Sequence, residues 1–169
     1  GALYGYFSSK EELFYALTDP MVEQLTDILD KIRNKMETLP KEKQLNGMGD
    51  IYYPNIPNIV DILISDRNAV KLIVDCAKGT KYEGFLDNIA MRNAESIRIA
   101  AENVEGKTVN SIEGQTMEVL MDGYIRTLFR LILSNKKRET IIQCMEMIGK
   151  IYEKGIIALM EEDVEDELR

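Results

Sequence analysis

Apolar residues recur every three or four positions over most of this chain, which is the spacing of amphipathic helices. The first such stretch follows Ser9, and Glu12 three residues later predicts a helix start closed by a capping box. The apolar positions keep one phase through Pro20 as far as Leu39, which predicts a single kinked helix. The alternative is a new helix with Asp19 as its N-cap and Pro20 in its first turn.

Five further helices are predicted downstream from the same periodicity. They cover about 57–65, 67–78, 81–103, 114–134 and 136–162, with loops expected at 41–56 and 105–114. The last two carry wide apolar bands and are joined by a short turn at Ser134 and Asn135, which predicts an antiparallel helical hairpin. No convincing run of alternating apolar residues predicts a strand, so the expected fold class is all-α.

The amino-acid composition excludes several classes of function. The chain has 169 residues, a formal net charge of −8, 45% hydrophobic and 30% charged residues, which is typical of a globular domain. It has no His, which removes the usual general base, the Ser and Cys triads and most zinc sites. We therefore expect no enzyme activity, no metal and no cofactor.

The cellular setting follows from the cysteines and from the apolar runs. Cys76 and Cys144 are too few and too far apart for a disulfide framework, so reduced thiols in a cytoplasmic protein are expected. No apolar run is long enough to span a bilayer, and no membrane partner is expected.

One polar residue stands out on the predicted helix 81–103. Asn93 falls near the centre of the apolar face that includes Leu86, Ile89 and Ile97, and Ser96 lies close by. A buried amide needs a hydrogen-bonding partner, either in the protein or in a bound molecule. Asn93 is therefore either a satisfied core residue or an anchor for a ligand.

The opening residues carry a family resemblance. Residues 1–13, GALYGYFSSKEEL, contain a Leu-Tyr-x-Tyr-Phe pattern, a tight turn and a Lys-Glu-Glu-Leu helix start. This segment resembles the end of the helix-turn-helix module of TetR-like (TetR/AcrR) transcriptional regulators. Residues 78–85, KGTKYEGF, also look like a segment common in such regulators. The family's first two helices would precede Gly1, so the expected organisation is a C-terminal remnant of the DNA-binding head in 1–17 and a regulatory domain in 18–169.

The resemblance implies a ligand-responsive, DNA-binding repressor, active as a homodimer, that releases operator DNA when a small, largely apolar effector binds. Tyr4, Tyr6 and Lys10 match phosphate-contacting positions of the family pattern, and such contacts set register on DNA without reading bases. The alternative for both tyrosines is simple packing at the edge of the module. Because only Gly1 and Ala2 remain of the base-reading end, the chain alone is expected to bind an operator poorly.

The remaining site predictions concern the regulatory domain. The expected effector-pocket residues are Asn93, Ser96, Tyr82, Phe85, Tyr124, Met121 and Cys76. The last two helices are expected to pair with their copies as a four-helix bundle, with interface candidates Leu128, Ile148, Gly149, Tyr152, Gly155 and Ile156. The alternative function is an all-helical small-molecule-binding or protein-interaction module with no DNA function.

Overall fold

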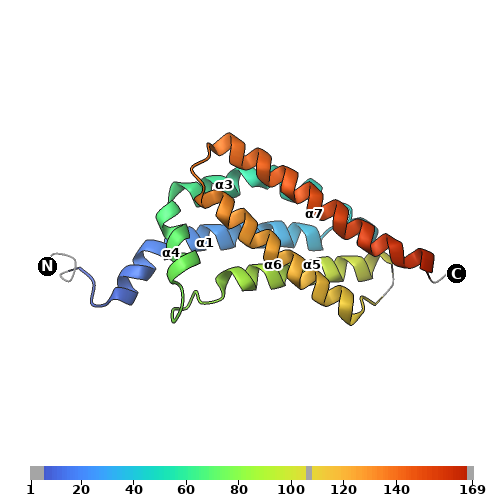
Figure 1. The fold of residues 1–169 in the computed structure, drawn as a ribbon, viewed down its shortest axis with the longest axis horizontal. Coiled ribbons are helices and arrows are strands. Elements are labelled where there is room, and N and C mark those ends of the chain that lie inside the picture. Colours follow the sequence, from blue (N-terminus) through green and yellow to red (C-terminus); the bar gives the residue numbers. More distant parts are fainter. Residues whose placement is uncertain (1–5, 106–107, 167–169) are drawn as a thin grey trace.

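The computed structural model describes residues 6–105 and 108–166, and within these ranges the chain is all-helical with no strand. Figure 1 shows the helices packed side by side, with α1 in blue and α7 in red. The elements are α1 (Lys10–Glu37), η2 (Lys41–Lys43), α2 (Met48–Tyr52), η3 (Tyr53–Asn55), α3 (Ile56–Ser65), α4 (Arg67–Cys76), α5 (Phe85–Glu105), α6 (Ser111–Leu133) and α7 (Arg138–Asp166).

Helix α1 begins as the sequence predicts and continues through Pro20. The Ser9 hydroxyl accepts a hydrogen bond from the Glu12 backbone N–H at 3.0 Å, which is one half of the predicted capping box. The Glu12 carboxylate instead accepts from the backbone N–H of Ser8 at 2.6 Å. Because the helix is continuous, the alternative of a new start with Asp19 as the N-cap is wrong.

The segment 41–56 is not the loop that the sequence predicts. It contains the short helix α2 and the 3-10 turns η2 and η3, and the apolar side chains of residues 45–53 pack onto the core. Leu45 and Gly49 are buried there, and Met48, Ile51 and Tyr52 pack against the core. These turns are too short for periodicity to reveal them, and packing rather than helix propensity stabilises them.

The ends of α5 and α6 also differ from the prediction. Helix α5 begins at Phe85 and not at Lys81, because Gly79 and Gly84 have φ of +78° and +74°, which ends helical geometry in the turns before it. Helix α6 begins at Ser111 and not near Gly114. The Asn110 side chain accepts from the backbone of the first turn, and Glu113 completes a reciprocal capping box.

The core forms where α1, α3, α4, α5, α6 and α7 meet. Helix α1 packs against α3 and α4, α5 pairs closely with α6, and α3 packs on α7. Helices α6 and α7 run in opposite directions, as the predicted hairpin requires (Figure 1). The largest fully buried side chains are Leu25, Ile56, Ile73, Ile132, Ile141 and Met145. Every helix within the described residues is too short or too polar to cross a membrane.

Candidate functional site

A cavity of about 520 Å³ lies between α1, the α2–η3 segment, α5, α6 and α7. It reaches the surface, since the edge residues Met91 and Arg92 have exposed side chains. The lining residues are Thr26, Leu29, Asp30, Ile32, Arg33 and Met36 of α1; Leu45, Met48, Gly49, Tyr52 and Tyr53; Phe85, Asn88, Ile89, Met91, Arg92, Asn93, Ser96 and Ile97 of α5; Met121 and Tyr124 of α6; and Gly149, Tyr152, Glu153, Ile156 and Ile157 of α7.

Most of this lining is apolar, with a few polar groups at separate places. Such a composition is typical of small-molecule sites, in which apolar contacts give affinity and the polar groups fix orientation. Four methionines and several Leu and Ile side chains supply an adaptable wall. The residues of α1 that line the cavity all belong to its second half.

Four tyrosines gather on one side of the cavity. The Tyr124 hydroxyl donates to the Tyr52 hydroxyl at 3.1 Å, and the rings of Tyr124 and Tyr152 lie 4.9 Å apart between centroids. The Tyr53 hydroxyl donates to Glu153 Oε2 at 2.6 Å. Burial raises the pKa of Tyr52, Tyr53 and Tyr124 above the ordinary value, so these phenols are neutral at physiological pH.

One charged cluster and one uncharged amide border the same space. Asp30 accepts from Arg33 Nη2 at 2.9 Å, and Arg92 Nη1 lies 3.6 Å from the same carboxylate oxygen. Both arginines therefore share one counter-ion. The side chain of Asn93, half-buried in the lining, makes no hydrogen bond to any described residue. Its amide is thus free to bind a ligand.

Five of the seven predicted pocket residues line this cavity: Asn93, Ser96, Phe85, Tyr124 and Met121. Cys76 does not, because it is exposed at the end of α4, and Tyr82 does not, because its ring turns toward α1. The contributions of α1 and of residues 45–53 were not predicted. Among the α1 residues, Ile32 and Met36 fall on the apolar stripe that periodicity assigns to the core and the others lie beside it. Residues 45–53 fall in an expected loop.

Several predicted dimer-interface residues face the interior of the chain instead. Gly149, Tyr152 and Ile156 line the cavity, and Leu128 is buried in the core. Their contacts therefore lie within one chain, and apolar periodicity alone does not separate such an inner face from an outer one. Their place in a dimer interface stays a prediction. Ile148 is half-buried and Gly155 is exposed.

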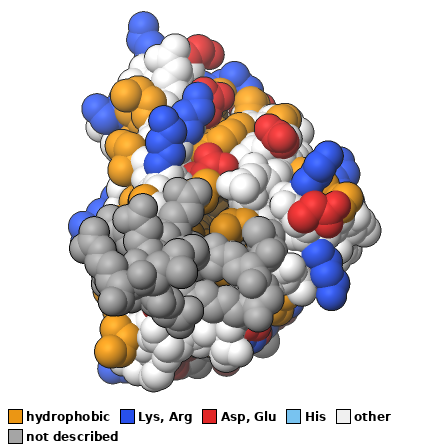
Figure 2. Space-filling view, turned by 90° about the vertical axis from the view of Figure 1, so that its right-hand side faces the viewer, with side chains coloured by type: hydrophobic (Ala, Val, Ile, Leu, Met, Phe, Trp, Pro, Cys, Tyr) orange, Lys and Arg blue, Asp and Glu red, His pale blue; other side chains and the backbone are white. Residues whose placement is uncertain are grey.

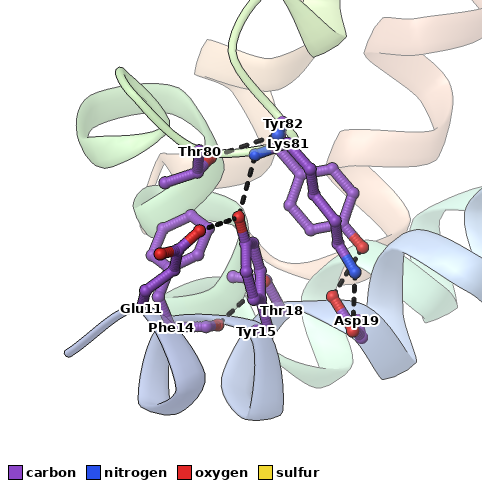
Figure 3. A network of polar contacts seen from close by, with 8 residues as sticks. All are labelled: Glu11, Phe14, Tyr15, Thr18, Asp19, Thr80, Lys81 and Tyr82. Carbon is purple, nitrogen blue, oxygen red and sulfur yellow. Dashed lines mark hydrogen bonds and ion pairs between the residues drawn. The ribbon is translucent and has the colours of Figure 1, made fainter. Parts of the chain in front are cut away.

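A polar and aromatic network joins the first half of α1 to the turns before α5, and Figure 3 shows it from close by. The Tyr15 hydroxyl accepts from the Lys81 backbone N–H at 3.0 Å and donates to Glu11 Oε1 at 2.6 Å. Asp19 accepts from the Tyr82 hydroxyl at 2.6 Å and from Lys81 Nζ at 2.9 Å. Burial, followed by the Asp19 carboxylate, raises the pKa of Tyr82 to about 12.

The same network continues to the cavity through aromatic contacts. The Tyr82 ring lies 6.4 Å from that of Phe14 and 5.9 Å from that of Phe85, and Phe85 lines the cavity. The Tyr82–Phe85 pair is edge-on, and such pairs add stabilisation beyond simple burial. The first half of α1 and the cavity therefore share a continuous set of contacts.

The predicted phosphate-contacting residues Tyr6 and Lys10 lie at or just before the start of α1, at the end away from the cavity. Tyr6 is 84% exposed, and Lys10 is exposed in the first turn of the helix. Tyr4 lies outside the described residues. Neither Tyr6 nor Lys10 forms a hydrogen bond or ion pair through its side chain within the described part of the chain, so both are free to meet a partner.

Residues 6–105 and 108–166 contain no cluster of acidic and Cys side chains that could hold a metal ion. Comparisons of the chain with protein-family models, with curated proteins and with solved structures gave no match.

Proposed function

We propose that this chain is the ligand-sensing and dimerising part of a TetR-like transcriptional regulator, with a remnant of its helix-turn-helix head in residues 1–17. The N-terminal motif supports the DNA-binding assignment, and the all-helical body with an internal cavity supports the sensor. The effector is a small, largely apolar molecule. Its binding releases the regulator from operator DNA.

The observation that carries this proposal is the double role of α1. One continuous helix of 28 residues, roughly 42 Å long at 1.5 Å per residue, begins beside the N-terminal segment and ends as a wall of the cavity. A ligand that fits one position of α1 better than another shifts the balance between them. The head, attached at the start of the helix, moves with it.

Contacts to DNA come from the exposed end of α1 in the intact regulator. Tyr6 and Lys10 bind phosphates there, together with Tyr4. The first amides of α1 and the Lys10 ammonium both favour an anion. These contacts place the head in register and do not read the sequence.

Dimerisation uses the outer surface of α6 and α7. Val119 on α6 is 73% exposed, and Met147 and Ile151 on α7 are 65% and 68% exposed. Met147 and Ile151 are four residues apart and so share one face of the helix. A second copy of the chain covers this surface.

Ligand binding is tested with 1-N-phenylnaphthylamine, a neutral lipophile whose fluorescence rises in apolar surroundings. We expect saturable binding to the wild-type chain. Asn93→Phe, which fills the cavity, should weaken that binding at least about ten-fold. Ile99→Phe, on the same helix but outside this cavity, should bind as the wild type does.

Equal binding by both variants would contradict the sensor assignment. Probe binding in the cavity together with an intact protein that binds no DNA would favour the alternative of a helical binding module with no DNA function.

A further inference from the structure

The carboxylate of Glu153 lies in the cavity without a cationic partner. Its Oε2 accepts from the Tyr53 hydroxyl at 2.6 Å. Its Oε1 lies close to the backbone of Gly49 in α2. A Cβ atom added to Gly49 would lie only 2.6 Å from this oxygen, so only glycine leaves room for the carboxylate there. Among the described residues, no Lys or Arg forms an ion pair with it. A half-buried carboxylate with one hydrogen bond retains unused capacity for a positive charge.

Four aromatic rings line the same cavity as this carboxylate. The rings of Tyr52 and Tyr53 lie 6.0 Å apart, and those of Tyr124 and Tyr152 lie 4.9 Å apart. All four line the cavity with Glu153. The face of an aromatic ring carries partial negative charge and attracts cations, most strongly where water is excluded. The rings and the carboxylate therefore both favour a positively charged ligand.

The nearby basic side chains do not act as the cationic partner of Glu153. Arg33 and Arg92 are bound to Asp30 at another part of the lining. Lys150 Nζ lies 5.8 Å from the centroid of the Tyr53 ring, but Lys150 is exposed and not part of the lining. Its ammonium stays hydrated at the surface, whereas the interior of the cavity is mostly apolar.

We propose that the cavity takes a lipophilic organic cation, whose charge lies beside Glu153 and the rings of Tyr52, Tyr53, Tyr124 and Tyr152. This inference rests on the proposed small-molecule site and names its ligand class. The apolar lining accepts the bulk of such a molecule, and Glu153 compensates its charge. An anion of the same size that lies beside the tyrosines meets the same rings but is repelled by Glu153, whereas Arg33 and Arg92, which share Asp30, attract it only at their own part of the lining.

Tetraphenylphosphonium and tetraphenylborate test this directly, because they have nearly the same size and shape and opposite charge. Calorimetric titration of the wild-type chain should show the cation bound at least about ten-fold more tightly than the anion. Glu153→Gln retains an acceptor for the Tyr53 hydroxyl and should weaken binding of the cation about ten-fold. The same change should leave binding of the anion unchanged or stronger.

Glu139→Gln is the matched control, because it removes the same charge from an exposed position on α7 outside the cavity. It should leave both affinities within about two-fold of the wild-type values. Unfolding temperatures without ligand confirm that the variants are folded.

Equal affinity for the two ions, or an unchanged affinity of Glu153→Gln for the cation, would overturn the proposal. Binding of 1-N-phenylnaphthylamine without selective binding of the cation would overturn the ligand class alone and leave the sensor assignment standing. If none of the three probes bound to the chain, both the ligand class and the sensor assignment would be overturned.

Discussion

At the scale of single residues, Asp19 and Tyr82 make one of the contacts that hold the first half of α1 to the turns before α5. Tyr82→Phe removes the hydroxyl that donates to Asp19 at 2.6 Å and leaves the ring in place. We expect the free energy of unfolding to fall by about 1 kcal/mol, as measured by urea denaturation. Tyr6→Phe is the control, because Tyr6 is 84% exposed and should change stability little.

The same tyrosine predicts a dependence on alkaline pH. The pKa of Tyr82 is raised from 10.0 to about 12 on folding, so the folded state holds its proton more tightly than the unfolded state. The stabilisation is complete below pH 10 and is lost as pH rises toward 12. Denaturation between these pH values should show a smaller loss of stability in Tyr82→Phe than in the wild type. An identical loss in both would contradict the role assigned to the Asp19 contact.

Single residues also mark the limit of what the sequence predicts about the site. Asn93 is recognisable because a polar side chain interrupts an apolar stripe. Glu153 is not, because it is one of several acidic residues on α7, and its partner Tyr53 lies 100 residues away in an expected loop. Which carboxylate turns inward is decided by packing across the fold, and no local pattern encodes it.

At the scale of elements, α7 offers a test with two glycines on one helix. At Gly149 a Cβ would stand 2.9 Å from Tyr53 Cε1, whereas at Gly155 it would meet nothing within 4 Å. Gly155→Ala should stabilise the chain by about 0.5–1 kcal/mol, because Ala has the higher helix propensity. Gly149→Ala should destabilise it by about 1 kcal/mol or more, since the Tyr53 ring, held by Glu153, must shift.

Urea denaturation of both variants measures these changes. Stabilisation by Gly149→Ala of the same size as by Gly155→Ala would show that Tyr53 does not pack tightly against α7. The Gly149 variant should also weaken binding in the cavity, because its new methyl group projects at a lining residue.

Helix positions were predictable at this scale, but several helix ends were not. Apolar periodicity located all the long helices, since each buries one face. The start of α5 depends on the positive φ at Gly79 and Gly84, and the start of α6 on the Asn110 cap. The positive φ angles and the N-cap are local features, and the spacing of apolar residues carries no information about them.

At the scale of the whole molecule, we expect a dimer that forms through α6 and α7. Ile151→Glu places a charge on their exposed apolar surface and should convert the dimer to a monomer at micromolar concentration, as measured by sedimentation equilibrium. Ile99→Glu alters an exposed apolar residue on α5 and should leave the dimer intact. A wild-type monomer, or equal effects of both substitutions, would exclude this surface.

The all-α architecture itself could be read from the sequence, but the outer face of the hairpin could not. Leu128 and Ile156 belong to apolar bands wide enough to serve either the core or a partner, and the structure assigns them to the core. Met147 and Ile151 became interface candidates only when the neighbours of α7 were known.

The claim that the N-terminal segment belongs to a DNA-binding head is tested most directly by selecting DNA with the intact protein. Random duplexes are passed through repeated rounds of binding, and the retained sequences are determined. We expect enrichment of one two-fold symmetric site, because a dimer presents two identical heads to successive major grooves. Retention of no common sequence, under conditions where the folded protein is a dimer, would contradict it.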